Sequence, residues 1–247
     1  MTTPNSPPPS VGKLAKLALA YASQYGVALE LRLRTRARAT RDLDIIVNHA
    51  DADLLQQLDD ALAPGYEGFG FRRKAEVRDL ENGAIRVEIA VDYRGGSWGT
   101  VQVDLARFES GQTEVELVDG MPLDRFGLVG PDQLPCLSLR YHVAQKIHGM
   151  TRPSTEAWRN DRERDLIDLL LLEELIADYD ALREACAEVF AFRAQHNWPP
   201  TGPLPAEWAE AVMALVREYE IPVESYGMAT TRVRNFIRRI DETGPGQ

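Results

Sequence analysis

The chain has 247 residues, of which 44% are hydrophobic and 27% are charged, and its formal net charge at pH 7 is −10. This length and composition are typical of a globular protein with one large domain or two modest ones. The acidic charge argues against a general nucleic-acid coat protein, because such proteins are basic overall, but it leaves room for a local basic groove.

The two cysteines, Cys136 and Cys186, lie far apart in the sequence and have no metal-type spacing. They predict neither a disulfide framework nor a zinc site, and they suit a reducing cytosol. No apolar run reaches membrane-spanning length, and the N-terminal stretch lacks the apolar core of a signal peptide. We therefore expect a soluble, cytoplasmic protein that does not associate with membranes.

Residues 1–10 are polar and rich in proline, which predicts a disordered tail. The helical spacing of apolar residues then predicts one helix from Val11 to about Tyr25, an interruption at Gly26, and a second short helix over 27–33. A glycine at the start of a helix lets the backbone approach a phosphate, and the N–H groups there favour an anion. The alternative is that Gly26 only breaks a helix.

The segment Asp42–Val47 predicts a strand that begins with two carboxylates. Side chains two apart in a strand point to the same face, so we expect Asp42 and Asp44 to project together while Leu43 and Ile45 face a core. Adjacent carboxylates repel unless a cation lies between them, and Mg²⁺ is the usual one. The alternative is a turn with solvated charges.

An arginine run comes immediately before this strand and suits a polyanion that approaches the same place. Its members are Arg32, Arg34, Arg36, Arg38 and Arg41. The alternative is a solvated basic face.

A helix is predicted over 50–62, and three strands follow it, over 69–75, 84–92 and 100–106. In the last strand Asp104 lies opposite the apolar face. Pairing of this strand with the one that carries Asp42 would bring three carboxylates together, as in two-metal sites for nucleotidyl transfer. The alternative for Asp104 is a solvent-facing polar position.

Residues 131–247 have helical patterns, with helices predicted over 134–150, 158–176, 179–195, 206–219 and 228–240. We therefore predict an α+β fold in two domains. The first, over 11–130, is a mixed sheet with helices, and the second, over 131–247, is a helical bundle.

Four motifs follow one another in the chain. They are Gly26-Val27-Ala28-Leu29-Glu30-Leu31-Arg32, Arg38-Ala39-Thr40-Arg41-Asp42-Leu43-Asp44, Val143-Ala144-Gln145-Lys146-Ile147-His148 and Arg164-Asp165-Leu166-Ile167-Asp168-Leu169. Each motif alone is loose, but their order and spacing resemble the AbiEii/AbiGii-type nucleotidyltransferases, the toxin component of a group of bacterial toxin–antitoxin systems. The resemblance runs from about Gly26 into the C-terminal helices and implies a nucleotidyltransferase-like first domain.

The resemblance also implies a function. We expect a Mg²⁺-dependent enzyme that moves a nucleoside monophosphate from an NTP to an acceptor hydroxyl, the 3′ end of tRNA, and thereby arrests growth. A cognate antitoxin is the expected protein partner. A further alternative is transfer to a small hydroxyl compound or to a protein.

The resemblance also implies roles for individual residues, according to their positions in the motifs. The resemblance implies that Gly26 lies against the triphosphate, that Asp42 and Asp44 bind metal, that Lys146 contacts the nucleotide phosphates and that the activity needs Asp165. For Lys146 and Asp165 the alternative is an ordinary ion pair between helices.

We add two further assignments to this set. Arg38, Thr40 and Arg41 are expected to bind nucleotide, although the two arginines suit an RNA backbone equally well. Asp104 is expected to be a third metal ligand, because of its place in the strand alternation.

One departure from the family gives a second hypothesis. The family usually has a short strand and a Lys-Gly-Gly element before the Ala-Leu-Glu stretch, whereas the helical pattern here leads directly into Gln24-Tyr25-Gly26. Tyr25 replaces the first glycine, and a side chain there would crowd a triphosphate. The alternative function is therefore a catalytically weak or inactive member that acts by binding a partner such as an antitoxin.

Overall fold

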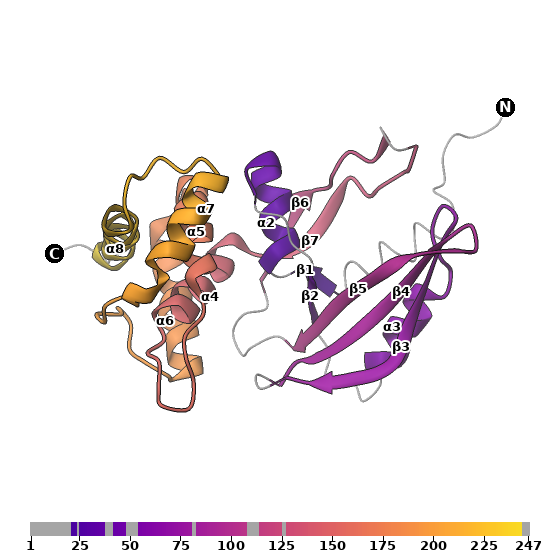
Figure 1. Cartoon of the computed structure of the whole chain (residues 1–247), viewed down its shortest axis with the longest axis horizontal. Coiled ribbons are helices and arrows are strands. Elements are labelled where there is room, and N and C mark those ends of the chain that lie inside the picture. The colour runs from indigo at the N-terminus through magenta and orange to yellow at the C-terminus, as the bar shows by residue number, and fades with distance from the viewer. Residues whose placement is uncertain are drawn as a thin grey trace. The chain divides into compact units, whose positions relative to one another are not determined.

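The computed structural model describes most of the chain, namely residues 21–23, 25–37, 42–47, 54–80, 83–107, 114–124 and 127–243. The chain divides into two compact units (Figure 1). The sheet unit comprises 1–32, 39–108 and 115–137, and the helical unit comprises 33–38, 109–114 and 138–247. The expected tail at 1–10 lies outside the described residues. A sheet unit with helices and a separate helical unit confirm the predicted α+β fold class.

The described strands form one seven-stranded mixed sheet in the order β3-β4-β5-β2-β1-β7-β6. Their bounds are β1 Tyr21–Ser23, β2 Asp42–Val47, β3 Phe69–Asp79, β4 Ile85–Tyr93, β5 Gly96–Arg107, β6 Val115–Asp119 and β7 Gln133–Leu137. Strands β3, β4 and β5 form an antiparallel meander, and β2 runs parallel to β5. The three consecutive strands expected from the alternating pattern are therefore present.

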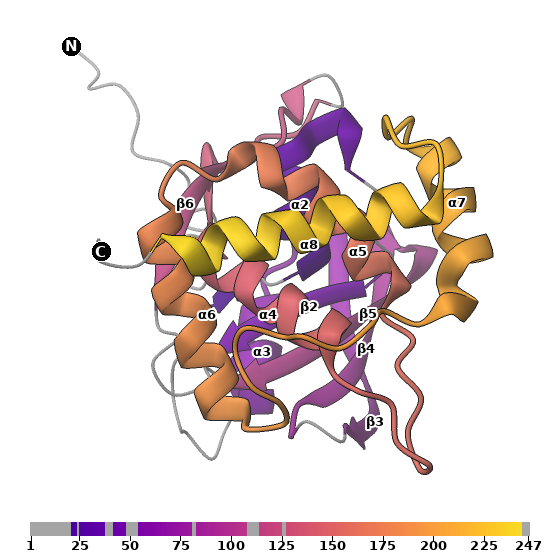
Figure 2. The same cartoon turned by 90° about the vertical axis from the view of Figure 1, so that its left-hand side faces the viewer.

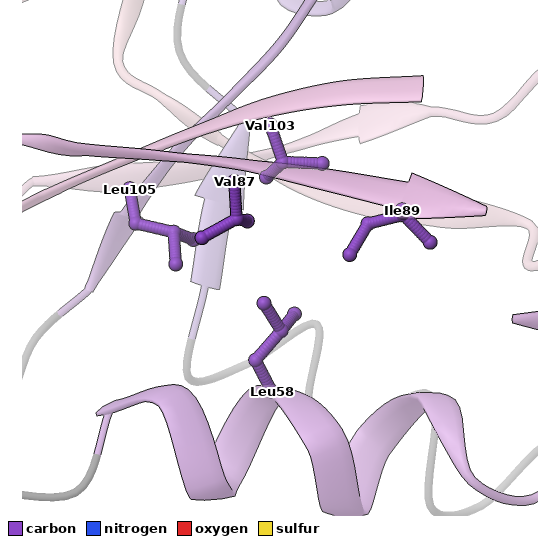
Figure 3. Packing of buried hydrophobic residues seen from close by; sticks show 5 residues of the cluster. All are labelled: Leu58, Val87, Ile89, Val103 and Leu105. Atoms are coloured by element: carbon purple, nitrogen blue, oxygen red, sulfur yellow. The ribbon is translucent and has the colours of Figure 1, made fainter. Parts of the chain in front are cut away.

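The core of the sheet unit lies between helix α3, Leu54–Leu62, and one face of the sheet. Leu58 projects from the helix towards the aliphatic side chains of β4 and β5 (Figure 3). Those side chains are Val87, Ile89, Val103 and Leu105. Leu43 and Ile45 of β2 pack against the same cluster, as the alternation in that strand predicted.

Helix α2, Tyr25–Leu33, packs on the same face of the sheet as α3. Its residues Ala28 and Leu31 contact Cys136 of β7. The register pairs Ile45 with residue 23 and residue 23 with Cys136, so Cys136 and Ile45 share a face. The even-numbered residues of β2 and β5 therefore lie on the face opposite the two helices.

The sequence-based expectation for residues 21–23 was wrong. Helical spacing predicted a helix through Tyr25, but these residues form β1, which pairs with β2 on one side and β7 on the other. Backbone pairing in the middle of a sheet outweighs a weak local helical pattern. Helix α2 then begins at Tyr25 and contains Gly26, so this glycine does not break a helix. The short strand expected of the family is therefore present.

The boundary between the units also differs from the expected position at residue 130. Residues 133–137, expected in a helix from 134, form β7 and pair with β6 and β1. Pro135 lies within this strand, and proline is poorly tolerated inside a helix. The sheet unit therefore extends to Leu137, and the first helix of the helical unit begins at Leu139.

The helical unit is built around one central helix. Its helices are α4 Leu139–Thr151, α5 Glu163–Leu172, α6 Tyr179–Arg193, α7 Ala209–Glu218 and α8 Tyr226–Glu242, with short 3₁₀ turns at Glu173–Leu175 and Ala206–Trp208. Every residue from Asp165 to Leu172 is buried, and α5 contacts α4, α7 and α8. The long helix α8 lies across α5 and α6 (Figure 2). A helix that is apolar on nearly all sides belongs at the centre of such a bundle.

Two helices of this unit begin at side-chain caps. Asp178 accepts a hydrogen bond from the N–H of Ala181 at the start of α6, and Ser225 accepts one from the N–H of Met228 at the start of α8. These bonds satisfy N–H groups that the helix itself leaves without partners. No helix in the described ranges is long and apolar enough to cross a bilayer.

Candidate functional site

Two carboxylates from distant parts of the sequence are neighbours in the sheet. Asp44 on β2 is the register partner of Asp104 on the parallel strand β5. Adjacent strands lie about 4.8 Å apart, and register partners project from the same face. The strand pairing expected from the sequence is therefore present, and it brings Asp44 and Asp104 side by side on the face opposite α2 and α3.

Asp42 lies two residues before Asp44 on the same strand and is the register partner of Gln102. Only its backbone is described. Among the described side chains, which leave out Asp42, no three histidine, cysteine or acidic groups are gathered as a metal site. The two neighbouring carboxylates of Asp44 and Asp104 are nevertheless oxygen donors of the kind that Mg²⁺ prefers. The chemistry of this donor set fits a hard divalent cation.

Asp104 is bound to an arginine that sequence reasoning missed. On β4, Arg86 is the register partner of Asp104, and its Nε and Nη2 atoms donate to Oδ1 and Oδ2 at 2.7 Å each. The Asp104 side chain is 15% exposed and that of Arg86 is 33% exposed. A bidentate arginine–carboxylate pair is among the stronger charge-assisted contacts. The signal was the tight turn between the two strands, because it sets which residues face each other.

The next charged pair along this face is Lys74 on β3 with Glu88 on β4, at 2.7 Å between Nζ and Oε2. Both side chains are more than 40% exposed, so this pair is weaker than the one at Asp104. Like the Arg86–Asp104 pair, it joins a basic side chain to a carboxylate, but it makes no bond to Asp44 or Asp104. The polar face thus carries charges of both signs.

Gly26 is the second residue of α2 and is buried. Strand β1 ends at Ser23, and α2 begins at Tyr25. The N–H groups of a first helical turn have no intrahelical acceptors and attract anions. The expected triphosphate-binding residue is therefore at a helix start, as the sequence suggested. Arg38, Thr40 and Arg41 lie outside the described residues.

Two described members of the arginine run, Arg32 and Arg36, are held in ion pairs within the protein. The Arg32 side chain is only 5% exposed, and its guanidinium donates to Glu116 at 2.6 Å and to the carbonyl oxygen of Leu137 at 2.5 Å. Arg32 therefore ties α2 to β6 and β7 instead of facing a polyanion. Arg36 pairs with Glu174 at 2.9 Å in an exposed contact.

Lys146 and Asp165 are brought together in the helical unit. The Nζ atom of Lys146 on α4 donates to Asp165 at 2.8 Å and to Asp168 at 2.7 Å, both on α5. The Lys146 side chain is 2% exposed and that of Asp168 is fully buried. Burial lowers the pKa of Lys146, but the two carboxylates outweigh it and the net pKa lies above the usual value. The ammonium is therefore charged at neutral pH.

Asn160 organises the loop between these two helices, and no pattern in the sequence marked it. Its Nδ2 group donates to the carbonyl oxygens of Gly149, Met150 and Arg152, at 3.1, 3.2 and 2.7 Å. Its Oδ1 atom accepts from the N–H of Arg162. One buried amide thus satisfies the C-terminal end of α4 and leads the chain into α5.

His148, near the end of α4, lies in an aromatic environment. Its ring centroid is 4.6 Å from that of His196 and 4.9 Å from that of Phe190, and the Arg193 guanidinium approaches its Nδ1 atom. Burial, followed by the nearby positive charge of Arg193, lowers the pKa of His148 to about 3. The imidazole is therefore neutral at neutral pH.

The fold and these residues can be compared with known proteins. The family model described as nucleotidyl transferase AbiEii toxin, type IV toxin–antitoxin system, matches residues 26–241. The solved structure of MenT4, a nucleotidyltransferase toxin from Mycobacterium tuberculosis H37Rv, is similar with a TM-score of 0.53 and 16% identity, over 94% of this chain and 95% of that chain. At this identity the likeness concerns the fold.

The protein JHP933 from Helicobacter pylori matches with a TM-score of 0.49 and 12% identity, over 94% of this chain and 91% of that chain. The comparison with curated proteins gives no match. The family match covers all four motifs found in the sequence and most of both structural units. The chain belongs to the AbiEii nucleotidyltransferase toxin family of type IV toxin–antitoxin systems.

Proposed function

We propose that the protein is a Mg²⁺-dependent nucleotidyltransferase that moves a nucleoside monophosphate from an NTP to the 3′ hydroxyl of tRNA. The observation that carries the proposal is the register pair of Asp44 and Asp104, in a chain that belongs to a nucleotidyltransferase family. Carboxylates that converge on one face of a sheet are the usual ligands in two-metal nucleotidyl transfer. The reaction belongs in the cytoplasm, where NTPs and tRNA occur together.

Asp42, Asp44 and Asp104 are the residues that would hold the metal. When bound there, Mg²⁺ neutralises the phosphate oxygens and favours ionisation of the attacking hydroxyl. The acceptor oxygen forms a bond to the α-phosphorus, and the bond from that phosphorus to pyrophosphate breaks. The N–H groups at the start of α2, near Gly26, bind phosphate oxygens of the NTP.

The remaining assigned residues supply positive charge and hydrogen bonds. Arg38 and Arg41 neutralise phosphate, and Thr40 donates a hydroxyl hydrogen bond to the nucleotide. In the helical unit, the hydrogen bond of 2.8 Å between Lys146 and Asp165 supports their alternative role as an ion pair between helices, because an ammonium that is only 2% exposed is not accessible to a phosphate. The bond to Asp168 keeps the same ammonium charged while it is buried. A cognate antitoxin is the proposed protein partner.

The test is incubation of the purified protein with each labelled NTP, Mg²⁺ and total tRNA. Wild type is compared with Asp44→Asn and with Glu88→Gln, a control that alters a carboxylate on the same face but away from Asp44. Label on tRNA that needs Mg²⁺, is lost in Asp44→Asn and persists in Glu88→Gln supports the proposal. Label that does not depend on Mg²⁺ or on Asp44 contradicts it.

The acceptor can be identified in the same system. Binding of tRNA should weaken steeply as salt rises, because contacts to phosphates release counterions. Label on a small hydroxyl compound or on a protein, with none on tRNA, would keep the reaction class but replace the acceptor.

The alternative function is a weak or inactive member that works by binding its partner, and Tyr25 is the observation that favours it. The variant Tyr25→Gly separates the two functions. Transfer that appears or increases in this variant would identify crowding by Tyr25 as the obstacle. A folded protein that transfers no label as wild type or as Tyr25→Gly, yet binds a partner, would favour the binding module.

A further inference from the structure

The polar face of the sheet holds a row of three charged residues across three adjacent strands. Asp104 on β5 is in the middle, with Asp44 of β2 on one side and Arg86 of β4 on the other. Both carboxylate oxygens of Asp104 accept hydrogen bonds from Arg86. The carboxylate nearest to Asp44 is therefore already neutralised by a side chain of the same sheet.

This arrangement has an electrostatic consequence for any cation shared by the two aspartates. A divalent ion between Asp44 and Asp104 would lie a few ångströms from the guanidinium of Arg86. The two positive groups repel each other, and near a protein surface the effective dielectric constant is low enough for such repulsion to be large. The ion would also have to share the Asp104 oxygens with the two N–H groups that now bind them.

We propose that Arg86 sets the divalent-cation affinity of this site by competing for Asp104. In the metal-free protein the guanidinium serves as an internal counter-ion, which offsets the repulsion between the two carboxylates on adjacent strands. When a cation binds, Arg86 gives up part of its contact with Asp104. This inference deepens the proposed function and rests on it, because the competing ion is the metal of that function.

A second ion pair on the same face provides a matched control. Lys74 binds Glu88 with the same 2.7 Å separation, on the same face of the same sheet. Its removal takes one positive charge from this face but leaves the Arg86–Asp104 pair intact. A general effect of surface charge on cation affinity should therefore appear when Lys74 is replaced. An effect of competition for Asp104 should appear only when Arg86 is replaced.

The experiment is a calorimetric titration of the full chain with Mn²⁺, which replaces Mg²⁺ at carboxylate sites. The variants are Arg86→Met, Arg86→Lys and Lys74→Met, each checked by circular dichroism. We expect Arg86→Met to bind Mn²⁺ about tenfold more tightly than wild type. Arg86→Lys keeps the positive charge, so its Mn²⁺ affinity should stay within about threefold of wild type. The Mn²⁺ affinity of Lys74→Met should stay within the same range. In transfer assays, the Mg²⁺ concentration for half-maximal rate should fall in Arg86→Met.

Unchanged or weaker Mn²⁺ binding in folded Arg86→Met would overturn the inference, as would equal tightening in Lys74→Met. The proposed function fails in a different way. If Asp44→Asn binds Mn²⁺ as well as wild type, or if wild type binds none, the metal site itself is wrong. If Mn²⁺ binding needs Asp44 but ignores Arg86, only the competition is wrong.

Discussion

Asp44 and Asp104 are register partners on adjacent parallel strands, although the whole of β3 and β4 separates them in the sequence. Neither residue is fully buried, and both lie on the face that α2 and α3 leave uncovered. Two carboxylates in such positions repel each other, and the protein offsets this repulsion at Asp104 through Arg86. A carboxylate retained here at an electrostatic cost is better suited to binding a cation than to stabilising the fold.

The variant Asp44→Asn tests this view of the pair. We expect it to lower nucleotide transfer by at least about 100-fold, because an amide is a much poorer ligand for a divalent cation. Its free energy of unfolding, measured in urea without divalent cations, should stay within about 1 kcal/mol of wild type. A variant that unfolds readily would instead give Asp44 a structural role. The control Glu88→Gln should retain both transfer and stability.

Lys146 is predicted to be essential for the stability of the helical unit. The variant Lys146→Met leaves Asp165 and Asp168 as buried carboxylates without their ammonium. Removal of one partner from a buried ion pair typically costs about 3–5 kcal/mol, and urea unfolding would measure the loss. Lys74→Met, which breaks an exposed pair, should cost less than about 1 kcal/mol. Equal losses of unfolding free energy in the two variants would contradict a structural role for Lys146 and its two carboxylate partners.

The free energy of unfolding should fall on acidification below about pH 6.5. Burial and the charge of Arg193 lower the pKa of His148 to about 3 in the folded protein, whereas in the unfolded chain it is about 6.5. Between these values the unfolded state binds more protons, so each pH unit of acidification costs up to about 1.4 kcal/mol. His196 adds to this, because burial lowers its pKa as well.

Urea unfolding at a series of pH values would check this dependence. The variant His148→Phe removes the titrating group and keeps an aromatic ring, so its unfolding free energy should fall less steeply between pH 6.5 and 4. A variant with the same slope as wild type would show that other groups cause the acid sensitivity.

Asn160 should be the most sensitive neutral residue of the loop between α4 and α5. The variant Asn160→Ala leaves three carbonyl oxygens at the end of α4 without their donor. Unsatisfied buried polar groups cost about 1–3 kcal/mol, so we expect a loss of roughly 2–3 kcal/mol in urea. Asn235→Ala, which removes an exposed hydrogen bond to Arg238, should change stability by less than about 0.5 kcal/mol. A small effect of Asn160→Ala would mean that water replaces its amide.

Most elements of this fold could be predicted from local pattern. The alternation in β4 and β5 identifies their buried sides, because in a strand each residue's exposure follows from its parity. The helices of the second unit are long enough for their apolar periodicity to be clear. The tertiary structure was needed for β1 and β7. They are short central strands whose residues are held by pairing on both sides, and such pairing leaves no local signature.

The sequence alone determined the family, the α+β class and the residue types of the site, since motifs and periodicity are local properties of the chain. The tertiary structure decided which of the possible ion pairs form. Asp104 is bound by Arg86, and Lys146 is shared by two carboxylates of α5, because strand register and helix packing bring distant residues together. The turn between β4 and β5 restricts the residues that can face Asp104, but the ion pairs that form depend on this long-range geometry.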